Sequence, residues 1–134
     1  MKKDIILPPV EDVILAVVKE TNEEGNTNWY AYIVNLKDTP LTDVIINSKG
    51  YGMVGEEQRK TSALRHYFKE IDAGDFAKIE VIMEDVFGLS NEYWVSFYIG
   101  KQIYDKKYIF LPETISESNF TQIPILNVKG VMIG

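Results

Sequence analysis

The residues YWVSFYI, GK and QIYDKKYIFL, at positions 93–99, 100–101 and 102–111, indicate most clearly how this chain folds. The first and third parts are rich in aromatic and β-branched residues, which favour strands. Gly100 and Lys101 suit a tight turn that has glycine at its first central position. Pro112 ends the second strand, because proline cannot donate to a strand ladder. The segment therefore predicts an antiparallel β-hairpin.

Aromatic side chains fall on both faces of this hairpin. Alternation along the first strand sends Tyr93 and Phe97 to one face and Trp94 and Tyr98 to the other. A single core needs only one of these faces, and Tyr and Trp are enriched at protein interfaces. We therefore expect a non-catalytic binding domain that forms a homodimer or binds a protein partner through its aromatic hairpin, with the binding residues Trp94, Tyr98, Tyr104 and Tyr108. The alternative is that these aromatic residues pack beneath the final segment, 120–133.

Further strand-like segments span 13–20, 29–36, 41–47, 76–83 and 122–132, with polar turns between them. About seven or eight short strands at this spacing predict a mainly β, single-domain antiparallel β-sandwich over residues 1–134, with an immunoglobulin-like arrangement as one option. In 76–83, regular alternation places Ala77, Ile79, Val81 and Met83 on one face. Lys78 and Glu80 are then expected on the opposite face.

The segment 61–71 fits two structures. Apolar residues at Leu64, Phe68 and Ile71 have near-helical spacing, and Thr61 or Ser62 could cap such a helix. The same residues alternate as Leu64, His66 and Phe68 against Arg65 and Tyr67, which is typical of a strand. We expect at most one short helix around 62–71, over the second half of the segment.

Glycines at positions 50, 52 and 55 form the spacing G-x-G-x-x-G, which is typical of dinucleotide-binding loops. This gives an alternative function, a nucleotide- or small-ligand-binding protein or enzyme that uses Gly50, Gly52 and Gly55 with Arg59 and Lys60. The next residues, Glu56 and Glu57, would place negative charge beside a diphosphate, and no alternation of strands and helices surrounds the motif. We therefore favour a loop between two strands.

Catalytic and metal-binding patterns are weak elsewhere. His66 is the only histidine and cysteine is absent, so a site with several histidines or with thiolates is excluded. The acidic pairs fit turns and surface positions, and we expect no catalytic residue, metal or cofactor. A third hypothesis is a small-ligand carrier whose pocket lies between the sheets and is lined by Trp29, Trp94 and Tyr98.

The composition limits which classes of partner the chain is expected to bind. The net charge of −6 argues against nucleic acid and against anionic membranes, which bind basic surfaces. No stretch approaches the roughly 20 apolar residues that span a bilayer, and the lack of cysteine fits a cytoplasmic protein.

Overall fold

The computed structural model describes residues 6–134, and its regular structure is almost entirely β. The strands are β1 (Val13–Thr21), β2 (Thr27–Asn35), β3 (Leu41–Val54), β4 (Glu57–Lys60), β5 (Leu64–Ile71), β6 (Phe76–Ile82), β7 (Ser90–Ile99), β8 (Gln102–Phe110), β9 (Thr121–Ile123) and β10 (Val128–Ile133). Two short 3₁₀ helices, η1 (Glu84–Val86) and η2 (Glu117–Asn119), follow β6 and β8. The expected mainly β class is confirmed.

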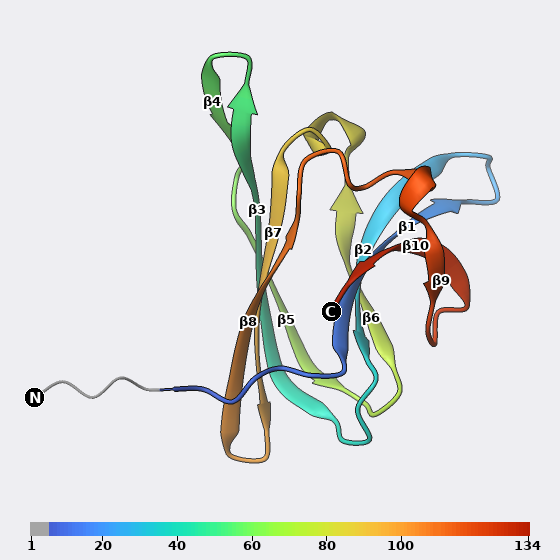
Figure 1. The fold of residues 1–134 in the computed structure, drawn as a ribbon. Coiled ribbons are helices and arrows are strands. Elements are labelled where there is room, and N and C mark those ends of the chain that lie inside the picture. The colour runs from blue at the N-terminus through green and yellow to red at the C-terminus, as the bar shows by residue number, and fades with distance from the viewer. Residues whose placement is uncertain (1–5) are drawn as a thin grey trace, which may run out of the picture.

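The strands form two antiparallel sheets that pack face to face (Figure 1). Sheet A has the order β6-β2-β1-β10-β9, and sheet B has the order β4-β3-β7-β8, with β5 also paired to β3. Strands β1, β2 and β6 thus share one sheet, while β3, β7 and β8 share the other. This is the order of strands A, B, E and C, F, G in immunoglobulin-like sandwiches. The hairpin β9–β10 extends sheet A beyond β1.

The hairpin at 93–111 has the predicted register. Ile99 pairs with Gln102 across the turn, and the ladder of β7 and β8 continues to Asn91 and Phe110. The inward residues of this hairpin join those of β1, β2 and β3 in one core, in which Tyr93, Phe97 and Phe110 are among the largest buried side chains. Burying an apolar side chain of this size contributes about 1.5–3 kcal/mol, so this face of the hairpin anchors sheet B.

Tyr108 fastens the hairpin to the other sheet by a polar contact. Its hydroxyl donates to the backbone oxygen of Val13, at 2.6 Å, while the ring itself is buried. Burial raises the pKa of the Tyr108 hydroxyl, because the phenolate would lose its hydration. The buried hydroxyl has its partner, as a stable core requires.

Of the two structures that fit 61–71, the strand is the one observed, and the preference for a short helix over its second half is wrong. Residues 64–71 form β5, which pairs with β3 from Ser48↔Leu64 to Leu41↔Ile71. Residues four positions apart share a face in a helix and also in a strand, so Leu64 and Phe68 could not distinguish the two. The segment is a strand because its backbone pairs with β3, which is distant in the sequence.

The two sheets differ in how their outer faces are covered. On sheet A, the outward residues Ala16, Val18, Tyr32 and Val34 pack with Ile123 in a second apolar cluster. Ile125 and Leu126, in the turn between β9 and β10, pack against the same cluster. The outer face of sheet B has no such cover within residues 6–134, as described below.

Asn35 links two turns at one end of the sandwich. Its side chain is fully buried, and the amide nitrogen donates to the backbone oxygens of Thr39, Ile71 and Asp72. These acceptors lie in the turn after β2 and at the end of β5. One amide group therefore fixes the positions of both turns.

Within residues 6–134, no helix has the length and apolar character that crossing a bilayer requires.

Candidate functional site

The outer face of sheet B carries exposed aromatic side chains. Trp94 and Tyr98 project from β7 with 40% and 38% of their surface exposed, and Tyr67 on β5 is 58% exposed. Ile45 of β3 pairs with Tyr67 on one side and with Ser96 on the other, which places it between them. We call the surface formed by Ile45, Tyr67, Trp94 and Tyr98 the aromatic face.

Charged groups of both signs surround the aromatic face. The indole nitrogen of Trp94 donates to Asp105 of β8, and the ammonium of Lys107 lies 4.5 Å from the Trp94 ring centre. On the other side, the Tyr67 hydroxyl donates to Asp43 at 2.6 Å. This hydrogen bond raises the pKa of Tyr67, because it favours the protonated phenol. Polar contacts thus orient the exposed rings of Trp94 and Tyr67.

The four aromatic residues predicted to bind are divided between two faces. Trp94 and Tyr98 lie on the exposed face, as the alternation predicted. Tyr104 is half-buried and stacks on Phe97, with ring centres 5.2 Å apart, and Tyr108 is buried in the core. The structure therefore brings only Trp94 and Tyr98 to an accessible surface.

The predicted carrier pocket lined by Trp29, Trp94 and Tyr98 does not exist. Trp29 is buried between the sheets, where its indole nitrogen donates to Glu84 at 2.9 Å. Its ring makes edge contacts with Phe87 and Phe120. Because Trp94 and Tyr98 point out of the opposite side of sheet B, the three rings cannot line one cavity.

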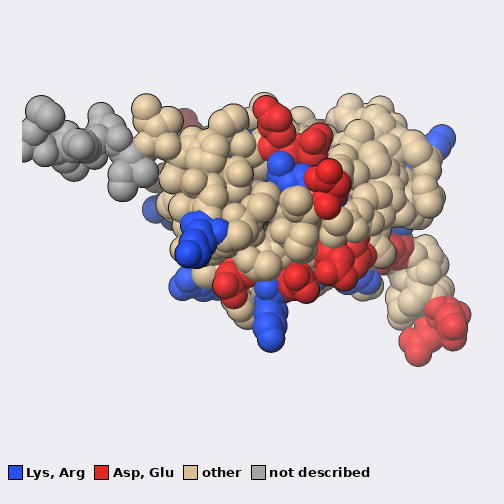
Figure 2. Space-filling view, turned by 90° about the horizontal axis from the view of Figure 1, so that it is seen from below, with Lys and Arg blue, Asp and Glu red and all other residues tan. Residues whose placement is uncertain are grey.

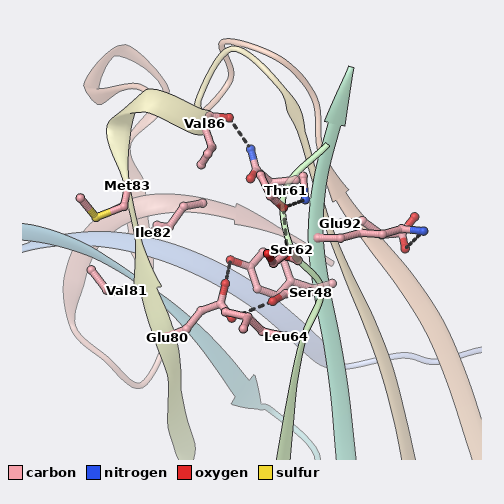
Figure 3. Close-up of a pocket in the computed structure, with 14 residues that line it drawn as sticks. Ser48, Thr61, Ser62, Leu64, Glu80, Val81, Ile82, Met83, Val86 and Glu92 are labelled. Atoms are coloured by element: carbon pink, nitrogen blue, oxygen red, sulfur yellow. Dashed lines mark hydrogen bonds and ion pairs between the residues drawn. The ribbon is translucent and has the colours of Figure 1, made fainter. Parts of the chain in front are cut away.

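A cleft does open between the sheets at another place, where β6 faces β3 and β5 (Figure 3). Its volume is about 240 Å³. Leu64, Ile82 and Val86 give it an apolar wall, and Ser48 and Glu80 supply polar groups. Figure 3 shows the Glu80 carboxylate directed from β6 toward Ser48. We call this space the Glu80 cleft.

Three side chains converge on the Glu80 carboxylate. The hydroxyl of Ser48 and Nε2 of His66 each lie 2.7 Å from Oε1, and the hydroxyl of Tyr93 lies 3.1 Å from Oε2. The Glu80 side chain is 14% exposed. Burial, together with the negative charge of Glu80, raises the pKa of Tyr93 well above its usual range. The carboxylate is therefore a hydrogen-bonded, partly buried charge rather than a surface acid.

A β-bulge brings Glu80 into the cleft. Ala31 of β2 pairs with Glu80 while its neighbour Tyr32 pairs with Lys78, so Ile79 is the extra residue. A bulge changes the direction of the side chains that follow it. Regular alternation had predicted Glu80 on the face opposite Ile79 and had predicted Val81 beside Ile79, and both predictions are wrong. Ile79 and Ile82 are buried, Glu80 faces the cleft, and Val81 is exposed.

The order of contacts differs from that of a Ser–His–acid catalytic triad. In a triad the histidine lies between the hydroxyl and the carboxylate, so that it can accept the hydroxyl proton. Here the carboxylate of Glu80 lies between Ser48 and His66, and both contact the same oxygen. The arrangement holds a carboxylate in place and gives Ser48 no histidine partner.

The glycines of the G-x-G-x-x-G spacing lie in a hairpin arm formed by the end of β3 and by β4, which projects beyond the sandwich (Figure 1). Gly55 has a φ of 64° in the turn of this arm. A Cβ at Gly50 would lie 3.0 Å from Cγ2 of Thr61, so glycine allows this close approach. A strand follows the motif, where a dinucleotide loop would have a helix N-terminus.

The basic residues assigned to the same alternative site are separated by the geometry of β4. Arg59 pairs with Gly52 and Lys60 pairs with Tyr51, and both side chains are exposed. Adjacent residues of a strand point to opposite faces. Arg59 and Lys60 therefore do not act on one ligand from the same side of the arm.

Acidic side chains gather at the end of the sandwich that holds the β2–β3, β5–β6 and β7–β8 turns. Figure 2 shows this end, with Lys and Arg scattered among Asp and Glu. Asp38, Asp72 and Asp75 are among its exposed residues. In the part of the chain that the structure describes, no three His, Asp or Glu side chains are grouped to hold a metal ion. The face in Figure 2 is also unlike the continuous basic surface that binds nucleic acid.

Among the residues that line the Glu80 cleft, Gly50 had been named from the sequence as a candidate binding residue, and His66, which contacts Glu80, had been noted only as the single histidine. Ser48, Glu80 and Tyr93 were missed as a group because they lie on three strands that are distant in sequence. Alternation had also placed Glu80 on the wrong face. No local sequence pattern predicts the bulge at Ile79. The sequence alone therefore could not show that these side chains meet.

Comparison with family models, curated proteins and solved structures finds no match to this chain.

Proposed function

We propose that this protein is a non-catalytic binding domain of the cytoplasm that self-associates through the aromatic face. The observation that carries the proposal is the difference between the two sheets. The turn of the β9–β10 hairpin packs against part of the outer face of sheet A, where Met132 and Val81 stay exposed. No such cluster packs over Trp94, Tyr98 and Tyr67 on sheet B within residues 6–134. Exposed aromatic residues with a polar surround are typical of protein interfaces.

The charges around the aromatic face favour a second copy of the chain as the partner. In a two-fold symmetric dimer the same surface meets itself, so it must be self-complementary. Asp43 and Asp105 lie beside Tyr67 and Trp94, and Lys107 lies over the Trp94 ring. With both signs present, an acidic group of one copy can face Lys107 of the other. A surface of a single sign would repel its own copy.

The net charge of the chain argues against nucleic acid and anionic membranes as partners. The chain carries 20 acidic and 14 basic residues, and nucleic acid and anionic membranes both bind surfaces with a net positive charge. The proposal therefore includes neither of these partners.

Sedimentation velocity over a range of protein concentrations tests the proposal. We expect a concentration-dependent dimer that Trp94→Ala weakens at least about tenfold, because hot-spot aromatic residues contribute more than about 2 kcal/mol to an interface. Tyr98→Ala should have a smaller effect in the same direction. The matched control is Met132→Ala, which removes a side chain of similar exposure, 38%, from sheet A.

Two results would reject self-association through this face. One is a monomer at every accessible concentration. The other is a dimer that Met132→Ala weakens as much as Trp94→Ala does.

A further inference from the structure

From the Glu80 cleft we infer a second binding site, which takes a small primary amine in its ammonium form. The site lies at the open edges of β5 and β6, whereas the aromatic face is on the outer side of sheet B. It therefore stands independently of self-association. The inference rests on what the cleft offers to a ligand: charge, free hydrogen-bonding capacity and an apolar wall.

The donors nearest Glu80 are already engaged, and the Lys49 ammonium at the cleft lies beside Glu92, at 3.8 Å. The hydroxyls of Ser48 and Tyr93 donate to Glu80, and Nε2 of His66 must also donate, since a carboxylate has no proton to give. The Thr61 hydroxyl donates to the backbone oxygen of Ser62 and accepts from the nitrogen of Gly50. The Ser62 hydroxyl is the one lining hydroxyl with no acceptor within residues 6–134, and the charge of Glu80 repels an anion, so a carboxylate or phosphate ligand is disfavoured.

The acceptor oxygens of the cleft can accept further hydrogen bonds. A carboxylate accepts about four hydrogen bonds, and Oε2 of Glu80 accepts one, from Tyr93. The amide nitrogen of Asn91 donates to the backbone oxygens of Val86 and Leu89, so its amide oxygen is turned toward Gly50. A ligand with several N–H donors satisfies this arrangement.

The negative charge of Glu80 has no lysine or arginine partner within residues 6–134. Its one ionic contact is with His66. Glu92 also lines the cleft, but Lys49 lies 3.8 Å from it and the Tyr51 hydroxyl donates to it at 3.3 Å. The partly buried charge of Glu80 therefore attracts a cation, and a charge-assisted hydrogen bond is stronger than a neutral one.

The volume of the Glu80 cleft and its apolar wall favour a small amine as the ligand. A volume of about 240 Å³ exceeds the roughly 30 Å³ share of one water, yet it is below the roughly 300–1,000 Å³ of pockets for drug-sized ligands. Leu64, Ile82 and Val86 can contact a short aliphatic chain while the ammonium group meets Glu80. A ligand of a few carbon atoms with one terminal ammonium group meets these conditions.

The test is an NMR titration of the full chain with butylammonium chloride, compared with 1-butanol and sodium butyrate. These probes share the aliphatic chain and differ in charge. We expect saturable shifts of the backbone amides of Ser48, Leu64 and Ile82 with butylammonium at millimolar concentration. Butanol should bind at least about tenfold more weakly, as expected when a charge-assisted hydrogen bond is lost.

Variants separate the role of the charge from that of the fold. Glu80→Gln keeps the acceptor oxygen for Ser48 and His66 but removes the charge, so it should weaken butylammonium binding at least about tenfold. Leu64→Lys changes a half-exposed strand residue and places a tethered ammonium at the cleft, which should abolish binding in a folded protein. Glu23→Gln, in the exposed loop after β1, is the matched control and should bind as the unmodified chain does.

The inference is overturned if butylammonium causes no saturable shift, if butanol binds equally well, or if Glu80→Gln and Leu64→Lys both bind with unchanged affinity. Trp94→Ala should leave amine binding intact, which distinguishes this site from the aromatic face.

Discussion

The Nε2 atom of His66 lies 2.7 Å from Oε1 of Glu80, and this contact joins strands of different sheets. His66 is on β5 and Glu80 is on β6, and each strand is hydrogen-bonded along only one of its sides. Ser48 and Tyr93 reach the same carboxylate from β3 and β7. One side chain of sheet A therefore receives hydrogen bonds from three strands of sheet B.

Removing the Glu80 carboxylate should destabilise the fold more than replacing it with an amide. Glu80→Ala leaves the buried hydroxyls of Ser48 and Tyr93 without their acceptor, and we expect a loss of about 2–4 kcal/mol in the free energy of unfolding. Glu80→Gln retains an acceptor oxygen and should cost about 1 kcal/mol. Urea unfolding at pH 7 measures both values, with Glu23→Ala as an exposed control. Equal losses for the two variants would show that the hydrogen bonds contribute little.

Stability should fall in alkaline solution, because burial raises the pKa of Tyr93 and Tyr108 in the folded protein. An unfolded tyrosine ionises near pH 10. Below that value both states bind the proton and the stability is fully present. As the pH rises above about 10, only the unfolded state loses its proton, so the free energy of unfolding falls by up to about 1.4 kcal/mol per pH unit for each tyrosine.

Comparing urea unfolding between pH 8 and 11 for Tyr93→Phe and the unmodified chain isolates the contribution of Tyr93. The variant should lose stability less steeply, since its ring cannot ionise. The raised pKa values of Lys19 and Lys78 act in the same direction and are common to both proteins. An unchanged slope in the variant would contradict the expected role of the Tyr93 hydroxyl.

Gly50→Ala should destabilise the chain by about 1–2 kcal/mol, because its new methyl group meets Cγ2 of Thr61 at 3.0 Å. Thr61→Ser removes that methyl group and keeps the hydroxyl that accepts from the Gly50 nitrogen at 2.7 Å. The double variant should therefore recover most of the stability lost in Gly50→Ala. Thermal or urea unfolding of the two single variants and the double variant completes the cycle. Additive losses would show that the glycine is needed for another reason.

The sequence predicted the parts of the fold that local patterns determine. Alternation and turn chemistry placed the hairpin at 93–111, its two faces and its turn, because both act between residues close in the chain. The strand at 64–71 could not be separated from a helix, since β3 supplies the deciding hydrogen bonds from more than 15 residues away. The Glu80 cleft was beyond local patterns for the same reason, and the bulge at Ile79 reversed the faces that alternation predicted.

Asn35→Leu should cost about 2–4 kcal/mol, because the backbone oxygens of Thr39, Ile71 and Asp72 lose their buried donor. The two turns that Asn35 connects should also become more mobile. Hydrogen exchange of the amides of Asn35 and Asp75 measures this, since the Asn35 nitrogen donates to the backbone oxygen of Asp75 and the Asp75 nitrogen donates to Asp72. Unchanged protection of both amides would contradict the linking role.

The bulge in β6 also determines which substitutions the strand can tolerate. Before the bulge the inward side chains are at odd positions, Ala77 and Ile79, and after it they are at even positions, Glu80 and Ile82. A saturation scan of residues 76–82 should therefore show sensitivity with a period of two residues whose phase reverses between Ile79 and Glu80. Lys78 and Val81, three residues apart, would be the permissive positions on either side of that reversal.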